Sequence, residues 1–321
     1  MQSLFMTMSQ QTTSRTPAEA SAAKTLRGQL RLGEKLIEGG IWLAGILAIV
    51  VLLGVFFLLL KEGLPIFVNT SPWDFFFGTK WYPVSEPPRF GTAPFFVSTL
   101  MVTALSTIIA VPIGIACAAY LAEVAPTNVR ETLKPIIELL AGFPSVVMGL
   151  IGLILLSPAV QSIFHLNTGL CGLTASIMLA FMSLPVIVSV SEDALSAVPD
   201  ESRQASYALG ATKWETIWHI SIPAALSGIA AAVMLGVGRA IGETMTVLMV
   251  AGGALGIPQS PVDPMMPMTA AIASGIGNAV RGGLQYQALF AIGLVLFILT
   301  LIVNVFADRV LERQKRKFAR T

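Results

Sequence analysis

Charged side chains are scarce in this sequence of 321 residues. They account for 12% of the chain, whereas hydrophobic residues account for 55% and the mean hydropathy is +0.77. Soluble domains carry about 25% charged residues, so this composition excludes a chain made of soluble domains. The 20 basic and 18 acidic residues nearly cancel, which excludes the strongly basic field that nucleic-acid binding requires. We therefore interpret the length in membrane spans and expect no nucleic-acid partner.

Cysteine and histidine are scarce as well. The chain has two cysteines, Cys117 and Cys171, both in apolar runs, and two histidines, His165 and His219. These are too few for a disulfide framework or a clustered metal site, so we interpret the cysteines as small apolar residues and expect no metal. The sequence also lacks a glycine-rich loop ending in Gly-Lys-Ser/Thr. By that route the chain cannot hold ATP, and any ATP energy has to come from another protein.

Long apolar runs, by contrast, are frequent, and six of them reach the roughly 20 helical residues that a bilayer requires. The clearest covers residues 41–60, which contain no charge. The sequence therefore predicts an all-α integral membrane protein with six transmembrane helices. The other five are expected at about residues 95–121, 136–160, 168–190, 224–252 and 286–307. Charged residues inside these spans are Glu138, Arg239 and Glu243.

Lysine and arginine are distributed unevenly over the connections between the spans. Fifteen lie on the side that holds both termini, and 4 lie on the opposite side. The positive-inside rule then predicts that both termini are cytoplasmic. We expect a cytoplasmic segment 1–40, a first transmembrane helix 41–60, an extracytoplasmic loop 61–94, a transmembrane core 95–308 and a basic cytoplasmic tail 309–321.

Basic residues in the first segment recur at spacings of three and four, with leucines between them. They are Lys24, Arg27, Arg31 and Lys35. This pattern fits a helix lying on the lipid surface, and it equally fits a solvated charged helix.

The outward side is expected to hold two long loops. The first, residues 61–94, carries Trp73, Trp81 and Tyr82, and the second, residues 253–284, carries four prolines. Loops of this length usually have a function. Exposed aromatic residues in the first loop are expected either to anchor a partner protein or to lie at the lipid headgroups.

Three predicted spans contain a central proline, namely Pro112, Pro144 and Pro185. A membrane helix tolerates proline where neighbouring helices or water satisfy the freed carbonyl group. These helices are therefore expected either to line a pathway or to be kinked for packing.

The fifth span combines small residues with two charges. Gly228, Ala232 and Gly236 are spaced by four, as are Gly238 and Gly242, which predicts faces where another helix approaches closely.

Arg239 and Glu243 lie one helical turn apart in the same predicted span. At 1.5 Å per residue, Arg239 lies about 22 Å from the start of the span, near the middle of the membrane. Each charge alone would cost about 2.5–3.5 kcal/mol, so we expect the two to form a neutralising pair. The pair is either structural or an anion site, in which the guanidinium exchanges its carboxylate for an oxyanion such as phosphate.

Between the fourth and fifth spans, residues 198–223 predict two short helices joined by a glycine turn. Asp200 is expected to cap the first helix and Gly210 to end it. Thr212 and Glu215 have the spacing of a capping box for the second helix. Their position between two spans places both helices on the cytoplasmic face.

The spacing within this loop is more specific. Gln204, Ala205 and Ser206 are followed after three residues by Gly210, then after nine by Ile220, and then by Ile222 and Pro223. This resembles the EAA-x3-G-x9-I-x-L-P cytoplasmic loop of ABC-importer permeases, with QAS in place of EAA and Ile222 in place of leucine. The changes at Gln204 and Ser206 are conservative in size, so the docking geometry is expected to be kept while an acidic contact is lost.

Two further segments strengthen the resemblance. Residues 137–153 (IELLAGFPSVVMGLIGL) and 235–247 (LGVGRAIGETMTV) resemble the PstC permease family of phosphate-specific (Pst) ABC transporters, over about residues 35–312. The sister permease of the same transporters has related motifs, but GRAIGETM followed by Thr246 and Val247 is more similar to the PstC family.

The resemblance implies a type I ABC importer in the bacterial inner (plasma) membrane. The chain would be a transport subunit without its own ATPase site, and would form the phosphate pathway with a second, non-identical permease subunit. Two cytoplasmic subunits would bind ATP and Mg, and an extracytoplasmic phosphate-binding protein would deliver the substrate; no cofactor is expected in this chain. The resemblance further implies that charged residues of the fifth span, Arg239 and Glu243, matter for phosphate passage, and that the motif residues of 198–223 couple to the ATPase.

Alternatives remain from the residues themselves. Another oxyanion could be the substrate, and a secondary anion transporter would share the spans and the charges but would not need a docking loop. An intramembrane hydrolase built on Ser145 is disfavoured, because a serine nucleophile needs a neighbouring base and both histidines lie outside the predicted spans.

Overall fold

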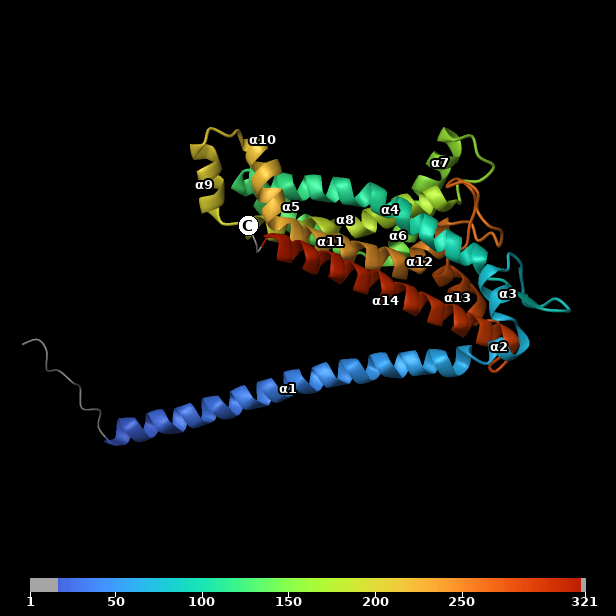
Figure 1. The fold of residues 1–321 in the computed structure, drawn as a ribbon, viewed down its shortest axis with the longest axis horizontal. Coiled ribbons are helices and arrows are strands. Elements are labelled where there is room, and N and C mark those ends of the chain that lie inside the picture. The colour runs from blue at the N-terminus through green and yellow to red at the C-terminus, as the bar shows by residue number, and fades with distance from the viewer. Residues whose placement is uncertain (1–16, 319–321) are drawn as a thin grey trace, which may run out of the picture. The chain divides into compact units, whose positions relative to one another are not determined.

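The computed structural model describes residues 17–318, and their side chains from residue 35 to residue 312 with gaps (Figure 1). The chain divides into two compact units, Met1–Phe57 and Leu58–Thr321. The first unit contains most of helix α1 (Pro17–Gly63), which runs without a break through the predicted boundary at residue 40. Lys24, Arg27 and Arg31 lie on this helix, but their side chains fall outside the described ones, so the lipid-surface helix stays a prediction.

The predicted loop 61–94 is largely structured. It contains helices α2 (Ile66–Asn69) and α3 (Pro72–Phe77) and a two-stranded antiparallel sheet, β1 (Trp81–Tyr82) and β2 (Arg89–Phe90). Its aromatic residues form much of a buried cluster with α13 (Met268–Ile276) and α14 (Leu284–Phe318). The burial of these rings explains why a segment so rich in proline and aromatics has a defined fold.

The central helices follow in chain order. They are α4 (Ala93–Ala119), the π-helical turn η1 (Tyr120–Val124), α5 (Thr127–Ala141), α6 (Ser145–Ile151), the π-helical turn η2 (Gly152–Leu156), α7 (Ser157–Ile163) and α8 (Gly172–Ser196). After α8 come α9 (Asp200–Ala208), α10 (Lys213–Thr216), the π-helical turn η3 (Ile217–Ser221), α11 (Ile222–Gly242) and α12 (Met245–Val250).

Six segments of the described chain are long and apolar enough to cross a membrane, which confirms the predicted fold class. Several boundaries were wrong: the fourth span runs to Ser196, and the fifth begins at Lys213 as one continuous helical segment. The third span begins at Ser145 and not at residue 136, because the chain breaks at Gly142–Pro144 and the residues before the break form the separate amphipathic helix α5. Glu138 is therefore an exposed residue of α5, and Pro144 precedes a helix instead of lying inside one. The fifth span ends at Gly242, followed by a break and the short helix α12.

Helix α8 is the centre of the second unit and packs against α4 and α11. On α11, a Cβ atom added at Gly236 would lie 2.6 Å from Ile187 of α8, and one added at Gly228 would overlap Ala194. The first predicted stripe of small residues is therefore confirmed as a close helix contact. Gly238 and Gly242, the second stripe, face open space in the described chain.

The two ends of the second unit differ in structure (Figure 1). Helices α9 and α10 lie at one end, and α2, α3 and the connection between α12 and α13 lie at the other. Residues 198–223 and residues 61–94 are thus at opposite ends of the helices, as the alternation of spans predicts.

Candidate functional site

Arg239 lies in the last turn of α11, and its side chain contacts the end of α5. Its Nη2 donates a hydrogen bond to the carbonyl oxygen of Ala141, at 3.3 Å. Ala141 is the last residue of α5, where helix carbonyls lack partners and carry partial negative charge. The cation is half-buried and lies against a helix end, with no salt bridge in the described part of the chain.

The predicted Arg239–Glu243 ion pair is wrong. Glu243 has extended backbone angles (φ −69°, ψ 130°) because α11 has ended, so the one-turn geometry that would bring the side chains together is lost. Instead, its Oε1 accepts from the backbone N–H of Thr246 at 3.3 Å, at the start of α12. Its own carbonyl oxygen accepts a bond from the Thr269 hydroxyl at 2.8 Å.

The two helix breaks lie together. The Thr246 hydroxyl donates to the carbonyl oxygen of Ser145 at 2.9 Å, which connects the start of α12 to the start of α6. Non-helical backbone at membrane depth is tolerated where it is buried in protein or lines a water-filled cavity. Here Gly142, Phe143 and Pro144 are exposed, so the break before α6 is not covered by this chain. Arg239 lies in the last turn before one break, and its guanidinium bonds to Ala141, directly before the other.

Sequence reasoning found Arg239 and Glu243 but missed their surroundings, namely Ala141, Ser145 and Thr246. The signal for one break was present in the Gly-Phe-Pro sequence at residues 142–144, since glycine and proline together commonly interrupt a helix.

Residues 198–223, between the fourth and fifth spans, are folded largely as predicted. Thr212 and Glu215 form the capping box at the start of α10. Gly210 has φ +85°, and the bonds from the Gly210 and Ala211 N–H groups to the carbonyls of Tyr207 and Ser206 complete a left-handed helix end. Asp200 does not cap α9; it is its first residue, and its carboxylate accepts a bond from Arg203 at 2.8 Å.

The motif residues fall into two groups. Gln204, Ala205 and Gly210 are exposed on this segment, together with Leu209, whose exposed fraction is 90%. The remaining motif residues are buried or half-buried; they are Ser206, Ile220, Ile222 and Pro223. The first group forms the exposed surface that a partner can contact, while the second is largely covered by the chain itself.

Comparisons with known proteins agree with this architecture. Residues 110–318 match the family described as binding-protein-dependent transport system inner membrane component. The chain belongs to this family. It is a multi-pass inner membrane permease component.

Relatives cover most of the permease. A probable ABC transporter permease protein of Bacillus subtilis (YqgH) is 38% identical, covering 86% of this chain and 88% of the relative. The phosphate transport system permease protein PstC of Mesorhizobium japonicum is 35% identical, covering 84% and 88%. Among solved structures, a bacterial alginate ABC transporter in complex with its periplasmic protein aligns with TM-score 0.60 at 16% identity, covering 90% of this chain and 96% of that chain. The inward-facing MetNI methionine transporter aligns with TM-score 0.53 at 20% identity, covering 68% and 93%.

A charge cluster joins α5 to the end of α8 in this permease. Glu192 is almost fully buried, at 1% exposure, and its carboxylate binds Arg130 and Lys134. Lys134 also contacts Asp193 at 2.6 Å. Hydrogen bonds to Asp193 and Glu192 raise the pKa of Lys134 above its usual value, so the amine stays charged at physiological pH. No sequence pattern indicated this cluster, because its members lie about 60 residues apart.

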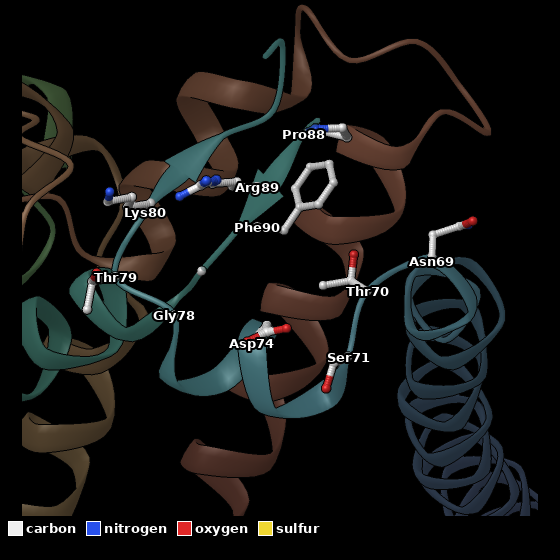
Figure 2. Close-up of a pocket in the computed structure, with 11 residues that line it drawn as sticks. Asn69, Thr70, Ser71, Asp74, Gly78, Thr79, Lys80, Pro88, Arg89 and Phe90 are labelled. Carbon is white, nitrogen blue, oxygen red and sulfur yellow. The ribbon is translucent and has the colours of Figure 1, made fainter. Parts of the chain in front are cut away.

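At the opposite end, a polar cavity of about 500 Å³ lies in the segment between α2 and α4. Figure 2 shows Arg89 on β2, Lys80 directly before β1 and Asp74 on α3 around this cavity. The expectation that the loop's aromatics are exposed was wrong for Trp81, which is 7% exposed and packs edge-on against Phe90 and Phe95. Trp73 and Tyr82 are exposed.

Proposed function

We propose that this chain is a permease subunit of an ATP-driven importer of inorganic phosphate. The observation that carries the proposal is the position of Arg239, a cation in the last turn of α11 that contacts the end of α5 and forms no salt bridge with any described residue. Relatives that are 34–35% identical and named as phosphate transport permeases support phosphate as the substrate.

Arg239 suits a phosphate pathway on chemical grounds. A guanidinium binds an oxyanion through two parallel hydrogen bonds, and that geometry is unavailable to lysine. Its present partner is a neutral carbonyl at 3.3 Å, a weak bond that an anion can replace.

Glu243 has a second role in this proposal. Its carboxylate is half-buried and lies four residues beyond Arg239. A carboxylate accepts a hydrogen bond from a protonated phosphate oxygen, whereas fully ionised sulfate has no proton to donate. Glu243 therefore favours phosphate over sulfate.

The other half of the pathway belongs to a second permease subunit. Apolar side chains around the breaks are exposed in this chain, including Phe143, Val146 and Met245. An exposed apolar surface beside a half-buried cation suits a partner that completes the pathway. The proposed complex also includes two subunits that bind ATP and Mg, docked at Gln204, Ala205 and Leu209. The orientation follows from the positive-inside distribution, with both termini cytoplasmic.

The outward face is proposed to meet an extracytoplasmic phosphate-binding protein. In the described part of the chain, neither Lys80 nor Arg89 forms a salt bridge, so both cations beside the cavity are available to acidic groups of a partner. Trp73 and Tyr82 add exposed aromatic surface nearby.

The test is anion uptake by the reconstituted complex in proteoliposomes. We expect radiolabelled phosphate uptake that requires ATP and the binding protein and that excess sulfate does not inhibit. Inhibition by sulfate would assign another oxyanion. Uptake without ATP, by a chain that purifies free of ATPase subunits, would assign a secondary anion transporter.

A further inference from the structure

Arg203, in the first half of α9, is held by an unusually complete set of acceptors. Its Nε and Nη2 donate to the same oxygen of Glu123, at 3.1 and 3.0 Å. Nη2 also donates to the carbonyl of Leu195 at 2.8 Å, and Nη1 donates to the carbonyl of Val198 at 2.6 Å. A further bond from Nη1 reaches Asp200 at 2.8 Å. One side chain therefore binds three separate parts of the permease.

These partners lie on elements that the sequence separates widely. Glu123 belongs to η1, which continues α4 to its end, and Leu195 lies in the last turn of α8. Glu123 is 80 residues from Arg203 in the sequence. The guanidinium therefore connects α9 to the ends of both α4 and α8.

Burial distinguishes this contact from an ordinary surface ion pair. The side chain of Arg203 is 13% exposed and that of Glu123 is 4% exposed, whereas Asp200 is 82% exposed. Exposed pairs contribute little, but breaking a buried pair leaves an uncompensated charge. Glu123 is thus the partner that fixes Arg203, and Asp200 is a peripheral one.

A second contact holds the other half of α9. The hydroxyls of Ser206 and Thr216 are 2.9 Å apart, and Thr216 is fully buried. Thr216 lies near the start of a continuous helical segment, Lys213–Gly242, that contains Arg239. Helix α9 is therefore attached to α4 and α8 at one point and to the helix that carries Arg239 at another.

We propose that Arg203 is a positioning residue that locks α9 to the ends of α4 and α8, so that these helices move with α9 as one body. The proposal rests on the proposed function, since α9 is the element offered to the ATPase. A displacement of α9 then reaches α4 and α8 through Arg203 and reaches α11 through Ser206. Without the Arg203–Glu123 contact, α9 moves on its own and ATP hydrolysis no longer drives transport.

The first test measures phosphate uptake per ATP hydrolysed by the full complex in proteoliposomes. Glu123→Gln and Arg203→Lys each remove the charge-assisted fork contact while keeping a polar side chain. We expect the ratio to fall at least about tenfold in each variant, with hydrolysis retained. The matched control is Asp200→Asn, which removes the exposed partner of the same guanidinium and is expected to stay within about twofold of the wild-type ratio. A parallel loss of hydrolysis and uptake, with the ratio unchanged, would overturn the proposal.

The second test does not depend on which anion is transported. Spin labels on native Cys117 of α4, which is exposed, and on Ala208→Cys of α9, also exposed, report the distance between the two helices. In the otherwise wild-type complex we expect one narrow distance distribution that ATP does not change. Adding Glu123→Gln should broaden it or make it respond to ATP. Identical distance distributions with and without Glu123→Gln would overturn the proposal that Arg203 locks α9 to α4 and α8. Absence of phosphate uptake by the wild type would contradict only the proposed function.

Discussion

Arg203 and Glu192, near the α9–α10 end of the permease, differ from Arg239 in how many partners their charged groups have. Arg203 and Glu192 are surrounded by partners that satisfy nearly all their hydrogen-bonding capacity. Among the described residues, Arg239 has one hydrogen-bond partner, a carbonyl oxygen at 3.3 Å. A fully paired buried charge stabilises one arrangement, whereas an under-paired charge retains free energy of interaction for another ligand. The comparison agrees with the proposed roles, in which Arg203 positions α9 and Arg239 serves the transported anion.

The largest effect on stability is expected at Glu192. Glu192→Gln keeps the shape of the side chain but leaves Arg130 and Lys134 without their shared carboxylate. Breaking a buried ion pair costs about 3–5 kcal/mol, and we expect the lower end because both cations are partly exposed. The thermal unfolding temperature of the purified complex should therefore fall. The control is Asp193→Asn, whose side chain is 63% exposed; an equal shift in both variants would remove the distinction between buried and exposed partners.

The next effect is expected at Gly210. Its φ of +85° strains any branched residue, although a Cβ atom there would meet no neighbour within 4 Å. Gly210→Val should cost about 1–3 kcal/mol locally and lower uptake per ATP, because the end of α9 no longer closes. Gly210→Asn should lower stability and uptake per ATP less than Gly210→Val does, since asparagine adopts left-handed backbone angles more readily. The ratio of uptake to hydrolysis, measured at matched protein levels, checks both; a wild-type ratio in the valine variant would contradict this account.

A smaller effect is expected on the proposed outward face, where two tryptophans differ in their exposure to solvent. A photoreactive residue in place of Trp73, which is 71% exposed, should cross-link to the binding protein in the assembled complex. Trp81 is buried, so the same replacement there should disturb folding instead. Position 108 on α4, occupied by the exposed Ile108, is the control for contact away from this face. Capture of lipid alone at position 73 would reject a docking role.

The smallest effect concerns Lys134 and pH. Its raised pKa means that its stabilising contribution is fully present below the ordinary lysine value of 10.5 and is lost only as pH rises through the folded-state value. The difference in melting temperature between wild type and a variant without this amine should therefore stay constant between pH 7 and 9. Comparing wild type with Lys134→Met across that range tests this. A difference that shrinks already by pH 9 would mean that the amine loses its proton earlier than its contacts imply.

Local rules predicted the features that depend on local sequence. Twenty apolar residues suffice to define a span, and Thr212 with Glu215 suffices to define a capping box, so both were found. Gly210 was identified because a glycine after a short helix favours a left-handed end.

Other features depend on contacts that sequence spacing does not encode. Arg203 and Glu123 are 80 residues apart, and only folding brings them together. The predicted Arg239–Glu243 pair failed because the one-turn rule assumes an uninterrupted helix, and α11 ends at Gly242. Residues 136–141, apolar except for Glu138, were assigned to a span because an amphipathic helix next to a span extends the hydrophobic run.

The central claim is that Arg239 serves the transported anion, and one substitution tests it most directly. Arg239→Gln keeps hydrogen-bonding capacity and removes the charge, so the complex should assemble and unfold at the wild-type temperature. The account predicts that ATP-dependent uptake of radiolabelled phosphate by this variant is abolished, and that Arg239→Lys restores little of it. Near-normal uptake by Arg239→Gln at matched protein levels would contradict the claim and reduce Arg239 to a structural contact of Ala141.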